Sequence, residues 1–236
     1  MYVRTIKDRE LSFIVSGKLW RDAMVMLDRE TMTHWSHLTG HAFKGDLAGQ
    51  ELEFYASEMT TWSEWLAANP GTRVLFKELE ERGETQSPYE NYFDNPDRLG
   101  IFGREIEDHR LKPKDVVVAV ESGDVSMVFP RDRLPRDRAV NTVLGEVAIV
   151  IVPTPAGGFL AYDRTVGDST PDLKVDGNRL SGAEGQAWDV VTGKPAPDTV
   201  DGTPPLEPLK AHVVYWFGWV SFFPNAQIWE GGEAQE

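Results

Sequence analysis

The 236-residue sequence predicts a mainly β protein of the α+β class, built from two pseudo-repeats of antiparallel strands. Three observations support this prediction: a long match between two parts of the chain, short alternating apolar segments typical of strands, and a pair of tryptophans at helical spacing in each matched part. We expect the strands of each repeat to be followed by a short capped helix and a closing strand.

The match joins residues 33–75 to residues 188–229. A WxxxTG unit starts at Trp35 and again at Trp188, an offset of 153. Other identical residues follow in the same order, at an offset of 160 for Tyr2, Arg4, Thr5, Asp8 and Gly17 and at an offset of 154 for Trp62, Trp65 and Pro70. Two copies with a period of about 155 residues indicate a duplicated unit, because solenoid repeats are only ~20–50 residues long. The change of offset from 160 to 153 places a loss of seven residues between Gly177 and Trp188.

The first repeat, residues 1–79, is expected to contain mostly strands and turns. Thr60 or Thr61 is placed to cap a helix. The apolar stripe of that helix has i, i+3, i+4 spacing and ends two turns later at a Pro-Gly pair: Trp62, Trp65, Leu66, Pro70 and Gly71. Strands are expected at residues 2–6 and 11–15, joined as a hairpin, and at residues 24–28 and 73–76.

Residues 80–115 have no counterpart in the match and are interpreted as a connector. Its aromatic residues are unusual for a disordered linker, so we expect it to lie against the protein. The second repeat, residues 116–236, starts with additional strands at 116–120, 125–129 and 147–152. Its segment 213–223 is apolar nearly all round, which implies burial on more than one side. We expect the three parts to form one compact unit.

Charge and composition exclude several classes of function. The net charge is 24 minus 38, or −14, which argues against nucleic acid or an anionic membrane as the main partner. The chain has no cysteine, so disulfides, thiolate nucleophiles and cysteine-based metal sites are excluded. No apolar run reaches the roughly 18 residues of a spanning helix, and the first residues lack the apolar core of a signal peptide. We therefore expect no membrane insertion and, by default, a cytoplasmic location.

Three histidines, His34, His37 and His41, lie close together in an HxxHxxxH pattern. Imidazole is a common ligand of zinc, copper and nickel, so this pattern is a candidate site for a divalent metal. Strand geometry, however, would point His34 and His37 to opposite faces, and the second repeat has no histidine at the matching positions. Polar loop histidines are the favoured interpretation.

Charged residues beside the predicted strands are further candidates. Asp28, Arg29 and Glu30 can supply acid, base and anion-binding groups for catalysis. A solvated turn explains them as well and is favoured, because Asp is common in turns. The candidate ligand-binding residues are Arg4, Arg164 and Glu58.

The tryptophan pairs, Trp62 with Trp65 and Trp216 with Trp219, each place two rings on one helical face. Stacking on a sugar or a base is one interpretation of these rings. Core packing is favoured, because each such ring buries about 150–250 Å² and a duplicated core requires a duplicated apolar stripe. The arginines of residues 131–138 are interpreted as a solvated loop, although an acidic partner or a phosphate is an alternative.

Seven segments form a specific combination: VSGKLWRDAMVMLDRET, WSHLTG, GDLAG, TTWSEW with its following proline, SPYENY, VVVAVESGDVSMVFP and the second WDVVTG. Together they resemble the bacterial and archaeal domain of unknown function numbered 3179, over nearly the whole chain. The resemblance implies an internally duplicated, β-rich protein with no established activity, in a family whose members are often exported. It also implies a CPLC-like segment just before residue 2, which this sequence lacks.

The favoured function is a non-catalytic module that binds a small ligand, or assembles with a partner, at the junction of the repeats. The alternative is a hydrolase or lyase that uses Asp28, Glu30 and His34, His37 or His41, with or without a metal. Whether the chain is an enzyme stays open. The strand at residues 2–6 would be a sheet edge, so we expect cover within the chain, a homodimer through this strand, or a truncated form of a longer protein.

Overall fold

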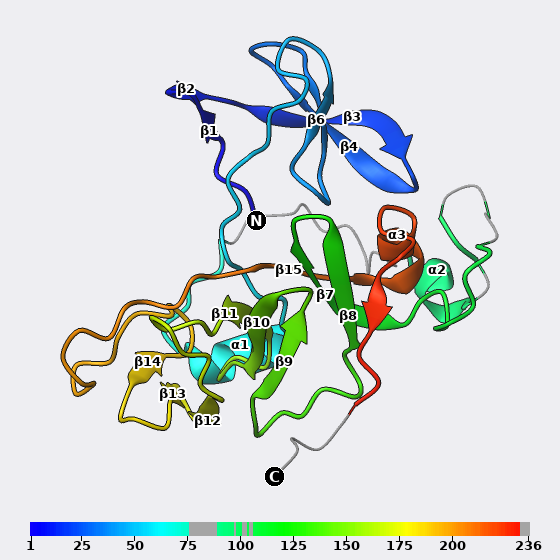
Figure 1. Ribbon diagram of the computed structural model, residues 1–236. Coiled ribbons are helices and arrows are strands. Elements are labelled where there is room, and N and C mark those ends of the chain that lie inside the picture. Colours follow the sequence, from blue (N-terminus) through cyan, green and yellow to red (C-terminus); the bar gives the residue numbers. More distant parts are fainter. Residues whose placement is uncertain (76–88, 97, 101–102, 104–105, 232–236) are drawn as a thin grey trace.

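The computed structural model describes residues 1–75, 89–96, 98–100, 103 and 106–231, and it confirms the mainly β, α+β class (Figure 1). The described strands form five sheets, accompanied by three short helices. The helices are α1 (Trp62–Ala68), α2 (Glu90–Asp94) and α3 (Trp216–Val220). None of these helices is long and apolar enough to cross a membrane. The expected connector, residues 80–115, lies partly outside the described residues.

Two of the sheets belong to the first part of the chain. A two-stranded sheet pairs β1 with β2, and a four-stranded antiparallel sheet has the order β3-β4-β5-β6. The four-stranded sheet lies at the top in Figure 1. The bounds are β1 Thr5–Ile6, β2 Arg9–Glu10, β3 Phe13–Trp20, β4 Ala23–Asp28, β5 His34–Ser36 and β6 Ala42–Lys44.

The other three sheets follow the connector. The largest has the order β15-β7-β8-β16, in which only β16 runs parallel to its neighbour among the described strands. Two three-stranded antiparallel sheets have the orders β11-β10-β9 and β12-β13-β14. The bounds are β7 Val116–Ser122, β8 Val125–Pro130, β9 Val140–Leu144, β10 Val147–Pro153, β11 Phe159–Asp163, β12 Lys174–Asp176, β13 Arg179–Ser181, β14 Ala187–Asp189, β15 Lys210–Tyr215 and β16 Gln227–Ile228.

The sheet β15-β7-β8-β16 is buried on both faces. On one face, Val118, Phe129 and Ile151 belong to a core cluster shared with β9, β10 and β11. On the other face, Val117 packs in a second cluster with Trp216 of α3. Successive residues of a strand point to opposite faces, so neighbouring valines serve different clusters. The predicted strands in this region are confirmed, and their continuous apolar runs follow from this two-sided burial.

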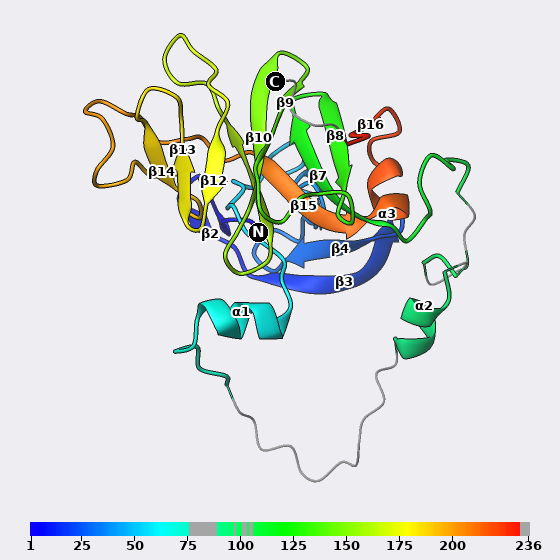
Figure 2. The same cartoon turned by 90° about the horizontal axis from the view of Figure 1, so that it is seen from below.

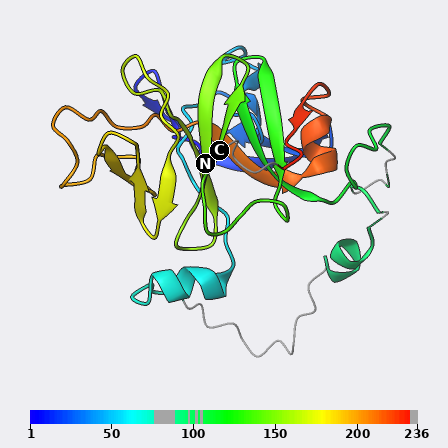
Figure 3. The ribbon, with the colours of Figure 1, turned by 60° about the horizontal axis from the view of Figure 1, so that its bottom comes forward.

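The helix predicted after Thr61 is confirmed as α1. Thr61 forms a capping box, in which Thr61 Oγ1 accepts from the Glu64 N–H and the Glu64 carboxylate accepts from the Thr61 N–H, both at 3.2 Å. The sequence predicts burial of both tryptophan pairs, and this prediction is wrong for Trp62, whose side chain is 53% exposed. Trp216 and Trp219 of α3 are fully buried, as predicted. Figures 2 and 3 show α1 at the edge of the molecule, apart from the sheets.

Two strand predictions are wrong in detail. Residues 2–6 and 11–15 do not pair with each other, because β1 pairs with β2 and β3 pairs with β4. Lys7 and Asp8, with positive φ of 47° and 63°, reverse the chain after two residues and shorten the first hairpin. The closing strand of the first repeat is absent at residues 73–75, and its last expected residue lies outside the described residues.

The two matched segments make equivalent hydrogen bonds. Four backbone N–H···O=C bonds of the first segment each have an equivalent in the second. The equivalent pairs, donor first, are Val3–Glu53 and Asp163–Glu207, Leu52–Gly40 and Leu206–Gly193, Tyr55–Met1 and Leu209–Ala161, and Gly40–Ser36 and Gly193–Asp189. The Tyr2 and Tyr162 hydroxyls donate to the carbonyls of Leu38 and Val191. The glycine of each WxxxTG unit has positive φ and lies against its tyrosine ring, where a Cβ would collide. The bonds of Val3 and Tyr55 also give the N-terminal segment a neighbour within the chain.

Strand pairing locates the difference in length between the matched segments. In the first segment, Val15 pairs with Met26 and Met26 pairs with Trp35. In the second segment, Val175 pairs with Leu180 and Leu180 pairs with Trp188, so these three residues are the counterparts of Val15, Met26 and Trp35. The offset therefore changes from 160 to 154 at the turn of the hairpin, so the β3–β4 hairpin is six residues longer than the β12–β13 hairpin. Its tip reaches the end of α3, where Arg21 Nη1 donates to Ser221 O at 3.1 Å and the Trp20 and Phe222 ring centroids are 5.2 Å apart.

Candidate functional site

The three candidate metal ligands have different partners. His34 Nε2 lies 3.0 Å from Lys18 Nζ, His37 Nδ1 lies 2.8 Å from the Met24 carbonyl oxygen, and His41 Nε2 lies 3.5 Å from a carboxylate oxygen of Glu51. Among the residues that the structure describes, no group of three His, Asp or Glu side chains could hold a metal ion. The structure does not bring the three histidines together as a metal site.

Asp28 is fully buried at the end of β4 and holds the turn that follows it. Its carboxylate accepts from the Trp35 Nε1–H at 2.8 Å, from the Thr31 N–H at 2.6 Å and from the Thr33 N–H at 3.2 Å. Burial alone would raise the pKa of Asp28, but these hydrogen bonds outweigh it and lower the pKa. Exposed Glu30 accepts from the Ser12 N–H at 2.8 Å, and Arg29 beside it is exposed. The contacts of Asp28 and Glu30 in the described chain are structural.

The three candidate ligand-binding residues lie in separate contacts. Arg4 pairs with Glu10 on the surface. Arg164 is buried, and its Nη1 lies 3.3 Å from Asp172 Oδ1 and donates to the Thr170 carbonyl. Glu58 accepts from the hydroxyl of Thr154, in the turn between β10 and β11. Glu58 therefore connects the segment before α1 to the second half of the chain.

The structure brings together charged residues that the sequence analysis did not single out. Lys210 of β15 lies opposite Glu121 of β7, with Lys210 Nζ 3.6 Å from Glu121 Oε1. The same ammonium contacts Glu51, which also lies beside His41. Burial raises the pKa of Glu121 to about 7. The Lys210 ammonium lies closer to Glu51 than to Glu121. Perturbed groups of this kind occur at functional sites and in structural ion networks alike.

His212 lies two residues further along β15, among aromatic rings. Its ring centroid is 5.4 Å from that of Phe54, 5.6 Å from that of Trp219 and 6.4 Å from that of Tyr2. Its Nε2 has no hydrogen-bond partner in the described chain. Burial lowers the pKa of His212 to about 3, so the ring is neutral at pH 7. These contacts make His212 a packing residue between β15, α3 and the Tyr2–Phe54 bridge of the first part of the chain.

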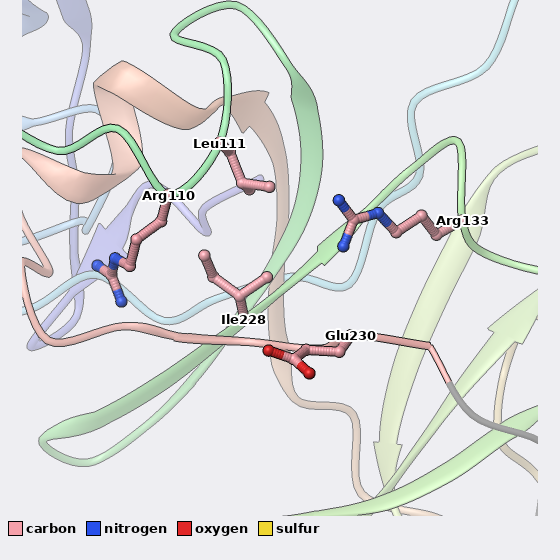
Figure 4. A pocket seen from close by; sticks show the side chains of 5 residues that line it. All are labelled: Arg110, Leu111, Arg133, Ile228 and Glu230. Atoms are coloured by element: carbon pink, nitrogen blue, oxygen red, sulfur yellow. The ribbon is translucent and has the colours of Figure 1, made fainter.

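A cavity of about 560 Å³ lies among the segment before β7, the turn after β8 and the chain at β16 (Figure 4). This volume is within the range of small-molecule sites, roughly 300–1,000 Å³. Leu111 and Ile228 point toward its centre, and the ends of Arg133 and Glu230 enter from one side. Arg110 lines the opposite side. Arg110, Leu111 and Arg133 precede the second matched segment, and Ile228 and Glu230 lie at its end. None of these lining residues belongs to the first matched segment, so the pocket is not at the junction between the two segments.

The two arginines of this pocket differ in their bonding. Arg110 donates twice to Asp108, to the Ala226 carbonyl at 2.7 Å and to the Pro224 carbonyl at 3.0 Å. These bonds fix Arg110 as a wall of the pocket. The exposed Arg133 side chain makes no hydrogen bond or ion pair with any residue that the structure describes.

Sequence analysis grouped Arg133 with a solvated loop, and the local sequence holds no signal that would separate it from its neighbours. The apolar residues that it faces, Leu111 and Ile228, are distant in the chain. Only the pairing of β7, β8 and β16 brings them together.

A family model matches most of the chain. Residues 1–226 match the family described as Protein of unknown function (DUF3179). No curated protein matches the chain. The match confirms the resemblance found in the sequence motifs. It covers the first matched segment, most of the second and Arg133, and it ends before Ile228 and Glu230.

Proposed function

The chain belongs to the family described as Protein of unknown function (DUF3179), and from that premise we propose that it is a non-catalytic module that binds a small zwitterion in the pocket beside Arg133. One observation carries this proposal: a guanidinium with no partner among the described residues enters a pocket with an apolar floor and a carboxylate on its wall.

The chemistry of the lining defines the class of ligand. A guanidinium binds a carboxylate through two parallel hydrogen bonds, and Glu230 can accept from an ammonium group. Leu111 and Ile228 would contact an apolar side chain that extends beside these two charges. Free amino acids with a branched apolar side chain have this arrangement.

The lining also supports binding without catalysis. Its five residues include no hydroxyl, imidazole or amine that could act as a nucleophile or as a general base. Glu230 is the one lining carboxylate that could act as a base, and in this proposal it pairs with the ammonium group of the ligand. A bound zwitterion would be held by ion pairs and apolar contacts alone.

The test is calorimetric titration of the full chain with leucine and two analogues. 4-Methylpentanoate lacks the ammonium group, and leucinamide lacks the carboxylate. We expect leucine to bind most tightly. Arg133→Ala should weaken leucine binding about 10- to 100-fold, the cost of a lost charge-assisted pair, and Glu230→Gln should weaken leucine more than 4-methylpentanoate.

Arg138→Ala is the matched control, because Arg138 is an exposed arginine of the same loop outside the pocket. It should leave binding unchanged. Absence of binding by all three compounds, or equal losses in the Arg133 and Arg138 variants, would refute the proposal.

A further inference from the structure

Two equivalent segments lead into the helices α1 and α3. Residues 56–61 precede α1 as β15 precedes α3, at the offset of 154. The contacts just before them are the same: the Tyr55 N–H donates to Met1 O at 2.8 Å, and the Leu209 N–H donates to Ala161 O at 2.9 Å. The two segments therefore start from equivalent positions.

Beyond this point the backbone pairing differs. β15 pairs with β7 over six residues. Residues 56–60 make no backbone–backbone hydrogen bond with any residue that the structure describes. The backbone groups of β15 alternate between two sides: the Leu209 N–H faces Ala161, and the Trp216 N–H faces Asp115 beside β7. Tyr55 and Met1 occupy the positions equivalent to Leu209 and Ala161. The N–H groups of Ala56, Glu58 and Thr60 thus face the side where β15 has its partner strand.

The covering of the two helices differs in the same way. The tryptophans of α3 are fully buried in a cluster with Val117 and Val128, which belong to β7 and β8. In α1, Trp62 is 53% and Leu66 38% exposed, and Met59 just before the helix is exposed too. Residues 56–60 lie in no described strand, and the side chains of Glu58 and Thr60 contact the β10–β11 turn at Thr154 and Ala156. Their backbone groups, unbonded within the described chain, lead directly into the exposed apolar face of α1. In the second half of the chain, one hairpin, β7–β8, satisfies both.

We propose that residues 56–61 accept an antiparallel β-strand from a partner protein, and that apolar residues of this partner cover Trp62 and Leu66. Unpaired backbone groups at an edge are a template for strand addition, in which main-chain hydrogen bonds give affinity and side chains give specificity. The pairing of β7 with β15 sets the expected register at six residues.

Charge identifies the partner as a basic segment. Residues 45–72 contain no lysine or arginine and have these acidic residues: Asp46, Glu51, Glu53, Glu58 and Glu64. Lys210 and Arg136 lie against Glu51 and Glu64, and the other three have no basic partner in the described chain. A second copy of this chain would place these carboxylates beside one another, which costs free energy. Lysines or arginines flanking an added strand would pair with them.

The test uses the full chain and two labelled peptides that contain the β7 sequence VVVAVES, one flanked by lysines and the other by glutamates. Fluorescence anisotropy should show binding of the lysine-flanked peptide, with the glutamate-flanked peptide at least about tenfold weaker. Hydrogen exchange measured by NMR should show fast exchange at the amides of Ala56, Glu58 and Thr60 in the free chain. Bound peptide should protect these amides.

Trp62→Ala should weaken peptide binding about tenfold or more, since aromatic anchors dominate such interfaces. Val143→Ala is the matched control, because Val143 is 49% exposed on β9, and it should have no effect. The proposal fails if neither peptide binds, or if binding leaves all three amides unprotected. A dimer in light scattering that Trp62→Ala dissociates would assign the face to a second copy and would also overturn it.

Discussion

Helices α1 and α3 have the same tryptophan spacing but are stabilised in different ways. In α3, four of five residues are buried and no side chain caps the N-terminus. In α1 no residue is buried, and the helix depends on its capping box and on the ion pair of Glu64 with Arg136, at 3.2 Å. The tryptophan motif therefore specifies a helix, whereas the strands packed on it decide whether its rings are buried.

The largest expected difference between the two helices is in tryptophan truncation. Trp216→Ala should lower the free energy of unfolding by about 3–5 kcal/mol, because it removes a fully buried ring. Trp62→Ala should change it by about 0.5 kcal/mol or less, since most of that ring surface is already in water. Urea denaturation measures both values. Equal losses in the two variants would show that α1 is covered in solution.

The second prediction concerns Glu121 on β7, the strand that covers α3 and has no counterpart beside α1 among the described residues. Its pKa is raised to about 7, so the folded chain keeps a proton that the unfolded chain loses near pH 4.5. The contribution of this group is fully present below pH 4.5 and is lost as pH rises through 7, by up to about 3 kcal/mol.

Glu121→Gln should abolish this fall in stability between pH 4.5 and 7.5. Unfolding free energies from urea titrations at several pH values measure it. His212, whose pKa is lowered to about 3, gives the opposite trend, with stability lost as pH falls below 6.5. The His212 trend is common to the parent protein and the Glu121→Gln variant, so the difference between their unfolding free energies isolates the effect of Glu121. Parallel curves for the two proteins would contradict the prediction.

The third prediction compares the tryptophans of the two WxxxTG units. Trp35 Nε1 donates to the Asp28 carboxylate, and Trp188 Nε1 donates to the Pro204 carbonyl, both at 2.8 Å. Asp28→Asn should cost about 2 kcal/mol, because buried donors then lose a charged acceptor. The lowered pKa of Asp28 means that this contribution is present at neutral pH and is lost as pH falls below about 4.

Thermal melts at pH 7 and pH 3 test the Asp28 prediction, since the variant should differ from the parent much less at pH 3. Asp198→Asn is a control, because Asp198 is an exposed carboxylate whose partner is Arg179. An Asp28→Asn variant that melts at the same temperature as the parent at pH 7 would contradict a structural role for the Asp28 carboxylate.

The smallest effect is expected for the cap. Thr61→Ala should cost about 1 kcal/mol, because α1 has no burial to replace the capping box. Circular dichroism with urea measures this loss, and Thr165→Ala serves as a control at an exposed threonine outside any helix. A loss as large as that of Trp216→Ala would indicate that α1 is more than a surface helix.

Sequence reasoning succeeded where the signal is local. The apolar runs of β7, β8 and β10 and the threonine cap of α1 could be predicted because each is contained in a few neighbouring residues. The exposure of Trp62 could not be predicted, because it depends on the absence of packed strands in the described chain. The pairing of the first hairpin was predicted wrongly because Lys7 and Asp8 adopt positive φ, a conformation that is uncommon for residues other than glycine.

The candidate site shows the same limit. Arg133, Leu111 and Ile228 come from three distant parts of the chain, and strand pairing alone places them around one pocket. The contacts of Lys210 with Glu51 and Glu121 likewise join the two halves. Such convergence has no spacing that a single sequence could reveal.

The extra length of the β3–β4 hairpin has a consequence for unfolding. Its tip holds the end of α3 through Arg21 and Trp20, so the first sheet cannot separate without disturbing the most buried helix of the other half. We therefore expect one heat-absorption peak in scanning calorimetry, with equal calorimetric and van't Hoff enthalpies. Shortening the hairpin to the length of β12–β13 should divide that peak into two.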